Sequence, residues 1–276
     1  MSRVVCVGLA TLDTIFALPR HPGPDDRVVA SELATAGGGP AATAAVALAR
    51  LGVDVAFVGA VGDDEVGAAV RVGLEREGVD VEELAVVPGA RSPQSSILVN
   101  AEGRTIVHYP GTVPPLAPGM RALERMRAAE WVHVDHAGYA AVPRDVRLSV
   151  DGGNPIPGLD LAGVALYGPT DVALERDFGS AEAALAAGAR LVVVTRGAQG
   201  CAAHTGDEVL EAAAAPLEEP VSTLGAGDVF HGALLAALVR GDTVPAALAF
   251  ANRCAALSCR ALDGRSAIPT IEEVDQ

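Results

Sequence analysis

The stretch Ser222–Leu238, STLGAGDVFHGALLAAL, joins a loop of small residues to a long apolar run. Gly225, Ala226 and Gly227 permit a tight turn and a close approach of the backbone to a ligand. A helix that starts here directs free N–H groups and the positive end of its dipole toward the same point. The pattern therefore predicts an anion-binding turn with the carboxylate of Asp228 beside it. A plain helix start, with Asp228 as its N-cap, is the alternative from spacing alone.

Asp228 has the chemistry of a general base for phosphoryl transfer. Such a carboxylate, ionised at a helix N-terminus, accepts the proton of an attacking hydroxyl while backbone amides stabilise charge on the transferred group. The chain contains no lysine, since all 20 of its basic residues are Arg. This excludes a P-loop lysine, the lysine of protein kinases and Schiff-base chemistry. Phosphate groups would have to be bound by backbone amides, helix termini, Arg or metal ions.

The composition limits the possible partners and the compartment. The chain has 276 residues, half of them hydrophobic, and a formal net charge of −15. That charge argues against nucleic acid or an anionic membrane as a partner, since both require clustered Lys and Arg. Uninterrupted apolar runs are too short to span a bilayer, and the N-terminal sequence lacks a cleavable signal pattern. Four scattered cysteines without a CxxC spacing predict reduced thiols in the cytoplasm.

Segments with strand and helix character alternate along the chain. Strands are expected at 3–9, 53–61, 131–135, 147–151, 164–167 and 190–195, and helices at 40–51, 65–77, 117–129, 181–187, 228–239 and 244–261. This order predicts an α/β fold with a mostly parallel central sheet covered on both faces, in a single domain over residues 1–276. Only about ten residues, 137–146, join two of the parallel strands, so a helix is shortened or missing there.

Two segments interrupt this alternation, and both have the pattern of exposed strands. One covers residues 27–33, and the other covers 95–109 with a hairpin signal at Asn100–Gly103. We expect them to pair as a small sheet over the ligand edge of the domain. The lid so formed would be built from segments of about 14–36 and 92–112.

Two more loops contain the glycines that a ligand-binding edge requires. Gly37, Gly38 and Gly39 precede Pro40 and an Ala-rich helix, although an ordinary loop-to-helix connection has the same pattern. The stretch VTRGAQG, residues 194–200, ends an apolar strand at a place where open α/β sheets bind ligands. A hairpin turn is an equally good interpretation of this second loop.

In their order along the chain, these motifs resemble those of the ribokinase-like, or PfkB-type, carbohydrate kinases. The resemblance covers nearly the whole chain and rests on GGGPAATAAVALARLG, VGAVGDDEVG, VTRGAQG and STLGAGDVFHGALL. It implies a three-layer α/β/α sandwich with a small β-sheet lid. It also implies an ATP-dependent kinase that transfers the γ-phosphoryl group to a hydroxyl of a small sugar, expected to be a primary one.

The resemblance assigns expected roles to individual residues. Asp228 would be the catalytic base, and Gly225, Ala226 and Gly227 would form the anion hole. The residues expected at the sugar are Asp13, Arg27, Gly38, Gly39, Thr43 and Gln94. Those expected along ATP are Thr195, Gly197, Gly200, Asn252 and Gly264. Three of these have structural alternatives: a loop carboxylate for Asp13, a solvent-facing polar residue for Asn252 and a helix-terminal glycine for Gly264.

The chain departs from the family pattern at three positions. Thr43 stands where relatives usually have Asn, and a hydroxyl cannot replace all the hydrogen bonds of an amide. Ser222 replaces an acid that helps to hold a monovalent cation, so a requirement for potassium is not expected. The Asn-x-x-Glu pattern linked to magnesium becomes Gly168–Asp171, in which only Asp171 keeps a carboxylate, and a helix N-cap is its alternative role. Mg²⁺ would then be held mainly by ATP phosphates and water.

The identity of the sugar is left open by the sequence. GGGPAATAAVALARLG, GAGDVFHGALL and GRSAIP look most like the branch that contains sulfofructose kinases. An anionic sugar needs a cation, for which Arg27 is the first candidate and Arg104 the second. Asp135 places negative charge at a strand end, so we favour a neutral or weakly anionic sugar. His108, His136 and His231 are expected to be polar loop or cap residues.

Two other functions are compatible with the same motifs. A nucleoside kinase would need an aromatic wall, for which Phe16, Tyr109 and Tyr139 are the candidates. A sensor of sugar or nucleotide on a kinase scaffold is the non-catalytic alternative, against which the intact Asp228 argues. The exposed edge of the lid predicts a homodimer.

Overall fold

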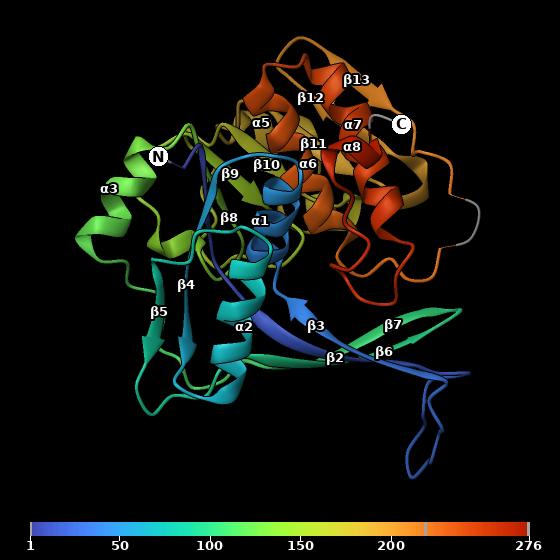
Figure 1. The fold of residues 1–276 in the computed structure, drawn as a ribbon. Helices are drawn as coiled ribbons and strands as arrows, with labels where there is room; N and C mark the ends of the chain where they lie inside the picture. Colours follow the sequence, from blue (N-terminus) through green and yellow to red (C-terminus); the bar gives the residue numbers. More distant parts are fainter. Residues whose placement is uncertain (1, 218–219, 275–276) are drawn as a thin grey trace.

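The computed structural model describes residues 2–217 and 220–274 (Figure 1). Its middle layer is a nine-stranded sheet in the order β13-β12-β11-β10-β9-β8-β1-β4-β5. The strands from β11 to β5 in this order are mutually parallel, and β12 is antiparallel to both of its neighbours, β11 and β13. The bounds are Val4–Val7 (β1), Val55–Gly62 (β4), Leu84–Val87 (β5), Trp131–Val134 (β8), Leu148–Asp151 (β9), Leu166–Gly168 (β10), Val192–Thr195 (β11), Cys201–His204 (β12) and Val209–Ala212 (β13).

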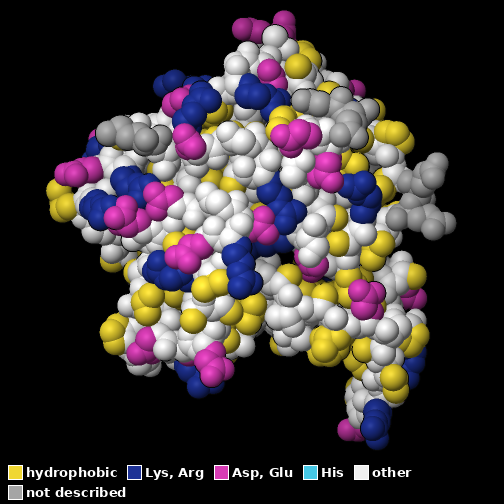
Figure 2. Space-filling model, in the orientation of Figure 1, with side chains coloured by type: hydrophobic (Ala, Val, Ile, Leu, Met, Phe, Trp, Pro, Cys, Tyr) yellow, Lys and Arg dark blue, Asp and Glu magenta, His cyan; other side chains and the backbone are white. Residues whose placement is uncertain are grey.

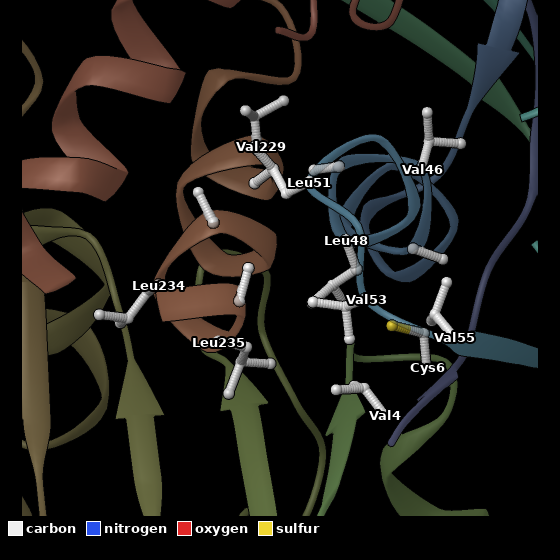
Figure 3. Packing of buried hydrophobic residues seen from close by; sticks show 14 of the residues in the cluster. Val4, Cys6, Val46, Leu48, Leu51, Val53, Val55, Val229, Leu234 and Leu235 are labelled. Atoms are coloured by element: carbon white, nitrogen blue, oxygen red, sulfur yellow. The ribbon is translucent and has the colours of Figure 1, made fainter. Parts of the chain in front are cut away.

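Helices cover both faces of this sheet, as the alternation of elements predicted. The helices of one face are Pro40–Arg50 (α1), Glu65–Arg76 (α2), Ala226–Arg240 (α6), Val244–Ser258 (α7) and Ile271–Val274 (α8). Those of the other face are Met120–Ala128 (α3), Asp171–Asp177 (α4) and Ala181–Ala186 (α5). Figure 3 shows α6 beside α1 over the strands, with Val229, Leu48 and Leu51 between them. The apolar run after Asp228 is therefore the part of α6 that packs into the core.

A separate four-stranded sheet forms the lid and projects from the body below α6 in Figure 1. Its strands are Thr11–Ala17 (β2), Glu32–Gly38 (β3), Gln94–Asn100 (β6) and Gly103–Tyr109 (β7), in the order β3-β2-β6-β7. The β6–β7 hairpin turns at Asn100 and Gly103, as predicted. The strand expected at 27–33 instead begins at Glu32, and Arg27 lies in the exposed loop before it. The lid strands reach from Thr11 to Gly38, beyond the expected segment of 14–36.

The short connection 137–146 contains no α-helix. A 3₁₀ turn at Tyr139–Ala141 is its only helical element, and the chain passes directly from β8 to the parallel β9. The expectation of a missing helix at this place is confirmed.

Asp135, at the end of β8, stabilises this region instead of facing a ligand. Its buried carboxylate accepts hydrogen bonds from four backbone N–H groups, those of Leu9 (2.8 Å), Ala41 (3.2 Å), Ala137 (2.9 Å) and Gly138 (3.0 Å). One of these donors belongs to the first turn of α1, where an anion is favourable. The argument that Asp135 repels an anionic sugar is therefore wrong, because the carboxylate is turned into the protein.

Several elements escaped prediction because their sequences are short or lack clear periodicity. They are the strands β5 and β13 and the helices α4 and α8. The VTRGAQG stretch is a hairpin between β11 and β12 with a 3₁₀ turn at Gly197–Gln199, which matches one of its two interpretations. Arg and acidic side chains are interspersed on the face shown in Figure 2. Within the described residues, no helix is long and apolar enough to cross a membrane.

Candidate active site

A pocket of about 440 Å³ lies between the lid sheet and the carboxyl ends of the central strands. Its walls come from the inner face of β2, β3, β6 and β7, from the N-termini of α1 and α6, and from the ends of β9, β10 and β11. Ligands of open α/β sheets bind at this edge, and the volume suits a small molecule with a phosphate tail. The structure thus brings together motifs that are more than 200 residues apart in the chain.

Most of the residues predicted for the site line this pocket, and the others lie outside it. The lining residues are Asp13, Gly38, Gly39, Thr43, Thr195, Gly225, Gly227, Asp228 and Gly264. The predicted residues that are not among the lining are Arg27, Gln94, Asp171, Gly197, Gly200, Ala226 and Asn252. Ala226 begins α6 between two lining glycines, so it remains part of the anion-binding turn.

The anion-binding turn has the conformation that its glycines predicted. Gly225 is the residue before α6 and adopts a φ of 75°, in the left-handed region that favours glycine. The first intrahelical bond is donated by Val229 to the carbonyl of Gly225 (2.9 Å). The N–H groups of Gly227 and Asp228 therefore have no intrahelical acceptor and are available to an anion. Asp228 is the third residue of α6, which rules out the alternative in which it is the N-cap.

Asp228 is a half-buried carboxyl group whose pKa is raised to about 7. Burial is the main cause, and the negative charge of Asp151 adds to it, while His231 and Arg104 act in the opposite direction. The sequence-based expectation of a fully ionised group at the helix N-terminus is corrected accordingly. A pKa near neutrality is favourable for a general base, because the group is then ionised in part and still holds a proton well.

The other end of the pocket is built around Asp13, which lies in the lid strand β2 and not at the end of the first strand. Thr11 donates a hydrogen bond to its carboxylate (2.7 Å), and burial raises the pKa of Asp13. A Cβ on Gly38 would lie 1.9 Å from Asp13 Oδ2, and one on Gly39 would lie 2.3 Å from the carbonyl of Leu9. Because these two glycines have no side chain, the carboxylate of Asp13 can pack directly against Gly38 and the backbone of Leu9 against Gly39.

Arg265 is a site residue that the sequence analysis missed. Its guanidinium is buried and donates from Nε to Thr43 Oγ1 (3.2 Å) and from Nη2 to the carbonyl of Gly38 (2.7 Å). Burial lowers the pKa of Arg265 to about 10, so it remains a cation at neutral pH. Thr43, which stands where relatives usually have Asn, thus has its hydroxyl held in place by Arg265.

Gln94, which we expected at the sugar, does not line the pocket, but its neighbour Ser95 does. Ser95 is paired with Asp13 across the parallel β2–β6 ladder and lines the pocket. Side chains alternate between the two faces of a strand, so Gln94 lies on the opposite face of the lid. Ser95, not Gln94, is therefore the β6 residue beside Asp13 in the pocket.

Asn252 and Asp171 have local structural contacts outside the pocket. The Nδ2 of Asn252 donates to the carbonyls of Ala212 (3.2 Å) and Ala213 (2.9 Å), and its side chain is buried and not solvent-facing. Asp171 is the exposed first residue of α4, and Thr170 is the N-cap of that helix. Both structural alternatives proposed from sequence for these residues are therefore wrong in detail.

The lid is attached to the anion-binding turn. Arg104 of β7 lines the pocket and donates from Nη1 to Thr223 Oγ1 (2.9 Å). Apolar residues of the lid, Ile15 and Ile97, pack in one buried cluster with Leu224 of the turn. The lid thus closes over the N-terminus of α6 and limits the access of water to it.

Three histidines that we expected to be polar loop or cap residues line the pocket. His108 lies on β7 and His136 follows β8. His231 lies on α6 one turn after Asp228, is buried, and has Nδ1 3.3 Å from Oδ2 of Asp151. This pairing raises the pKa of His231 and holds the pKa of Asp151 at about 2.

A parallel sheet covered on both faces, a glycine-rich helix N-terminus and an adjacent carboxyl base define a phosphotransferase with an alcohol group as acceptor. A model of the pfkB family carbohydrate kinases matches residues 1–145 and 169–271 of the chain. The protein therefore belongs to the pfkB family of carbohydrate kinases.

Relatives of known name agree with this assignment. The ribokinase of Bacillus subtilis is 29% identical, over 100% of this chain and 99% of its own. The ATP-dependent ribose-1-phosphate kinase of Halopiger xanaduensis is 30% identical, over 99% of this chain and 97% of its own. The structure of Arabidopsis thaliana ribokinase complexed with ribose and ATP has a TM-score of 0.84 and 24% identity, with 99% of this chain and 97% of that chain covered. The fold is thus ribokinase-like, and the enzyme is an ATP-dependent kinase of a carbohydrate or nucleoside.

Proposed function

We propose that the protein phosphorylates a small sugar, with Asp228 as the base that activates a primary hydroxyl. The observation that carries this proposal is the shared pocket. It is lined by Asp228 and the first turn of α6 together with Asp13, Gly38 and Thr43. Carboxylate and hydroxyl groups beside exposed backbone are well suited to bind the hydroxyls of a sugar.

The roles of the chain's own groups follow from this geometry. Asp228 takes the proton of the attacking hydroxyl, and the N–H groups of Gly227 and Asp228 stabilise charge on the transferred group. The triphosphate of ATP would lie toward Thr195, which lines the pocket, with Gly197 and Gly200 in the β11–β12 hairpin next to it. Gly264 would close the nucleotide side against Gly225, its packing neighbour. The lid keeps bulk water from the reacting phosphoryl group.

Magnesium would come to this site with ATP. Because Mg²⁺ prefers oxygen ligands and keeps several waters, the phosphates of ATP would be its main ligands, and it would neutralise their charge. Asp171 is exposed and outside the pocket, so its proposed link to the ion through water is not supported by its position. The Oγ of Ser222 accepts a hydrogen bond from Leu224 (3.2 Å) within its own loop, which supports an enzyme without a potassium requirement.

An anionic sugar is the second candidate substrate, and Arg104 favours it. Arg104 lines the pocket, whereas Arg27, the first candidate from sequence, lies in an exposed loop. A relative named ribose-1-phosphate kinase has 30% identity to this chain. A nucleoside is less favoured, because Phe16, Tyr109 and Tyr139 are not among the described residues that line the pocket.

The experiment that tests the proposal measures ADP release from Mg·ATP across ketoses, aldoses, sulfosugars, sugar phosphates and nucleosides. The proposal predicts turnover of a neutral sugar well above the rate of ATP hydrolysis. Preference for a sugar phosphate would support the second candidate, with Arg104 as its anion ligand. Tight binding of a sugar without ADP release would contradict a kinase and favour a sensor.

We also propose that the protein is a cytoplasmic homodimer that associates through the lid. The outer face of the lid exposes three large apolar side chains, with Leu33 and Val107 each 61% exposed and Tyr109 45% exposed. An exposed apolar sheet face of this kind is typical of an interface. All four cysteines are free and buried, which suits a reducing compartment.

A further inference from the structure

Three side chains that are good metal ligands meet beneath the first turns of α6. His133 comes from β8, Asp151 from the end of β9 and His231 from α6. They are 0%, 5% and 6% exposed. One ligand atom of each lies within 4.8 Å of the other two. No step of the proposed phosphoryl transfer uses His133.

The polar atoms of this cluster have few partners. His133 Nδ1 lies 3.1 Å from Ser149 Oγ, which leaves Nε2 as the free nitrogen. Among the described residues, this Nε2 has no hydrogen-bond partner, and Nδ1 of His231 has only its 3.3 Å contact with Asp151. Buried polar atoms are normally satisfied, so Nε2 of His133 points to a missing ligand.

The distances fit the coordination geometry of a small divalent cation. Two ligands that are each about 2.0–2.1 Å from a tetrahedral zinc ion are roughly 3.4 Å apart. The Nδ1 of His231 and the Oδ2 of Asp151 are separated by 3.3 Å. The ligand atom of His133 lies within 4.8 Å of the other two. Ser149, which contacts the other nitrogen of His133, would act as the outer partner that orients a ligating imidazole.

We propose that His133, Asp151 and His231 bind one divalent cation of the zinc type. Two imidazoles and one carboxylate suit Zn²⁺ or Co²⁺, whereas Mg²⁺ and Mn²⁺ prefer oxygen ligands. Asp151 and His231 line the pocket and His133 does not, so the remaining coordination position opens toward the pocket. This site is separate from the magnesium that ATP carries, and it does not depend on the proposed sugar kinase activity.

The test measures binding of the metal alone, without ATP or sugar, to untagged protein that was first treated with a chelator. Competition with a chromophoric chelator gives the affinity for Zn²⁺, and the visible spectrum of added Co²⁺ reports the ligand geometry. We expect one ion per chain and a tetrahedral or five-coordinate Co²⁺ spectrum. Ser149→Ala should weaken binding by about 10- to 100-fold, and His133→Asn by at least that much. His204→Asn, which alters a histidine of β12 outside the cluster, should change nothing.

Weak binding without a fixed stoichiometry, or equal affinity in wild type and His133→Asn, would overturn the proposal. Circular dichroism must show that each variant is folded. If His133→Asn does not fold, anomalous scattering from wild-type crystals soaked in Zn²⁺ decides between an ion at these three residues and an ion elsewhere. Because none of these readouts involves turnover, their failure is distinguishable from the failure of the kinase proposal.

Discussion

Asp228 shows how the environment of a single carboxyl group sets its reactivity. Burial beneath the lid and the charge of Asp151 disfavour its ionised form, while His231 and Arg104 favour it. The balance places its pKa at about 7. A carboxyl group in water, with a pKa near 4, would be a much weaker base for a sugar hydroxyl.

This balance predicts the pH dependence of the reaction. The base must be deprotonated, so kcat/KM for the sugar should be low below the pKa of Asp228, rise through about pH 7 and level off above it. The profile is measured at saturating Mg·ATP with the best sugar of the panel. A rate that is constant from pH 5 to 8 is the contrary result, because a base with an ordinary carboxyl pKa of about 4 would be ionised throughout that range.

At the scale of an element, Asn252 of α7 stabilises the β12–β13 hairpin. Its amide donates to the carbonyls of Ala212 and Ala213, and Cys201 Sγ lies 3.4 Å away. We infer that Asn252 stabilises this hairpin and does not contact ATP.

Asn252→Ala should therefore lower the free energy of unfolding by about 1–3 kcal/mol, because two part-buried hydrogen bonds are lost and the buried side chain is truncated. The KM for ATP should change little. Urea unfolding and steady-state kinetics check the two parts. Arg253→Ala, at the exposed next residue of α7, is the control and should be neutral. A stable Asn252→Ala enzyme with greatly weakened ATP affinity would instead indicate a direct contact with the nucleotide.

At the scale of the whole molecule, the two faces of the lid have different properties. The inner face contributes Asp13, Ser95 and Arg104 to the pocket. The outer face exposes Leu33 and Val107, and Figure 2 shows hydrophobic side chains on the lid. Association through the outer face would stabilise the lid without blocking the pocket.

Val107→Arg should convert the proposed dimer to a monomer, because a charge cannot be buried in an apolar interface without a partner. Val172→Arg, the same substitution at a 74% exposed position of α4, should leave the assembly unchanged. Sedimentation velocity measures both masses. A wild-type monomer, or a Val107→Arg protein of wild-type mass, would contradict association through this face.

The sequence predicted those parts of the molecule that depend on neighbours in the chain. The turn at Gly225 and the glycines before α1 are local features, and helix and strand periodicity indicated the central sheet. The contact of Arg265 with Thr43 joins residues 222 positions apart, and no local pattern indicates it. The choice between Gln94 and Ser95 depends on which face of β6 meets the pocket, which is fixed only when the lid docks on Leu224. The buried positions of the histidines could not be predicted for the same reason, since their partners come from other strands.

The central claim, that Asp228 is the base of a phosphoryl transfer, is tested most directly by the turnover of Asp228→Asn. Asn preserves the size of the side chain but cannot accept the proton, so we expect kcat to fall by about 100- to 10,000-fold on the best sugar. Binding of Mg·ATP, measured by calorimetry, should be retained, because the N–H groups of α6 are unchanged. A variant that turns over its sugar at nearly the wild-type rate would contradict the account.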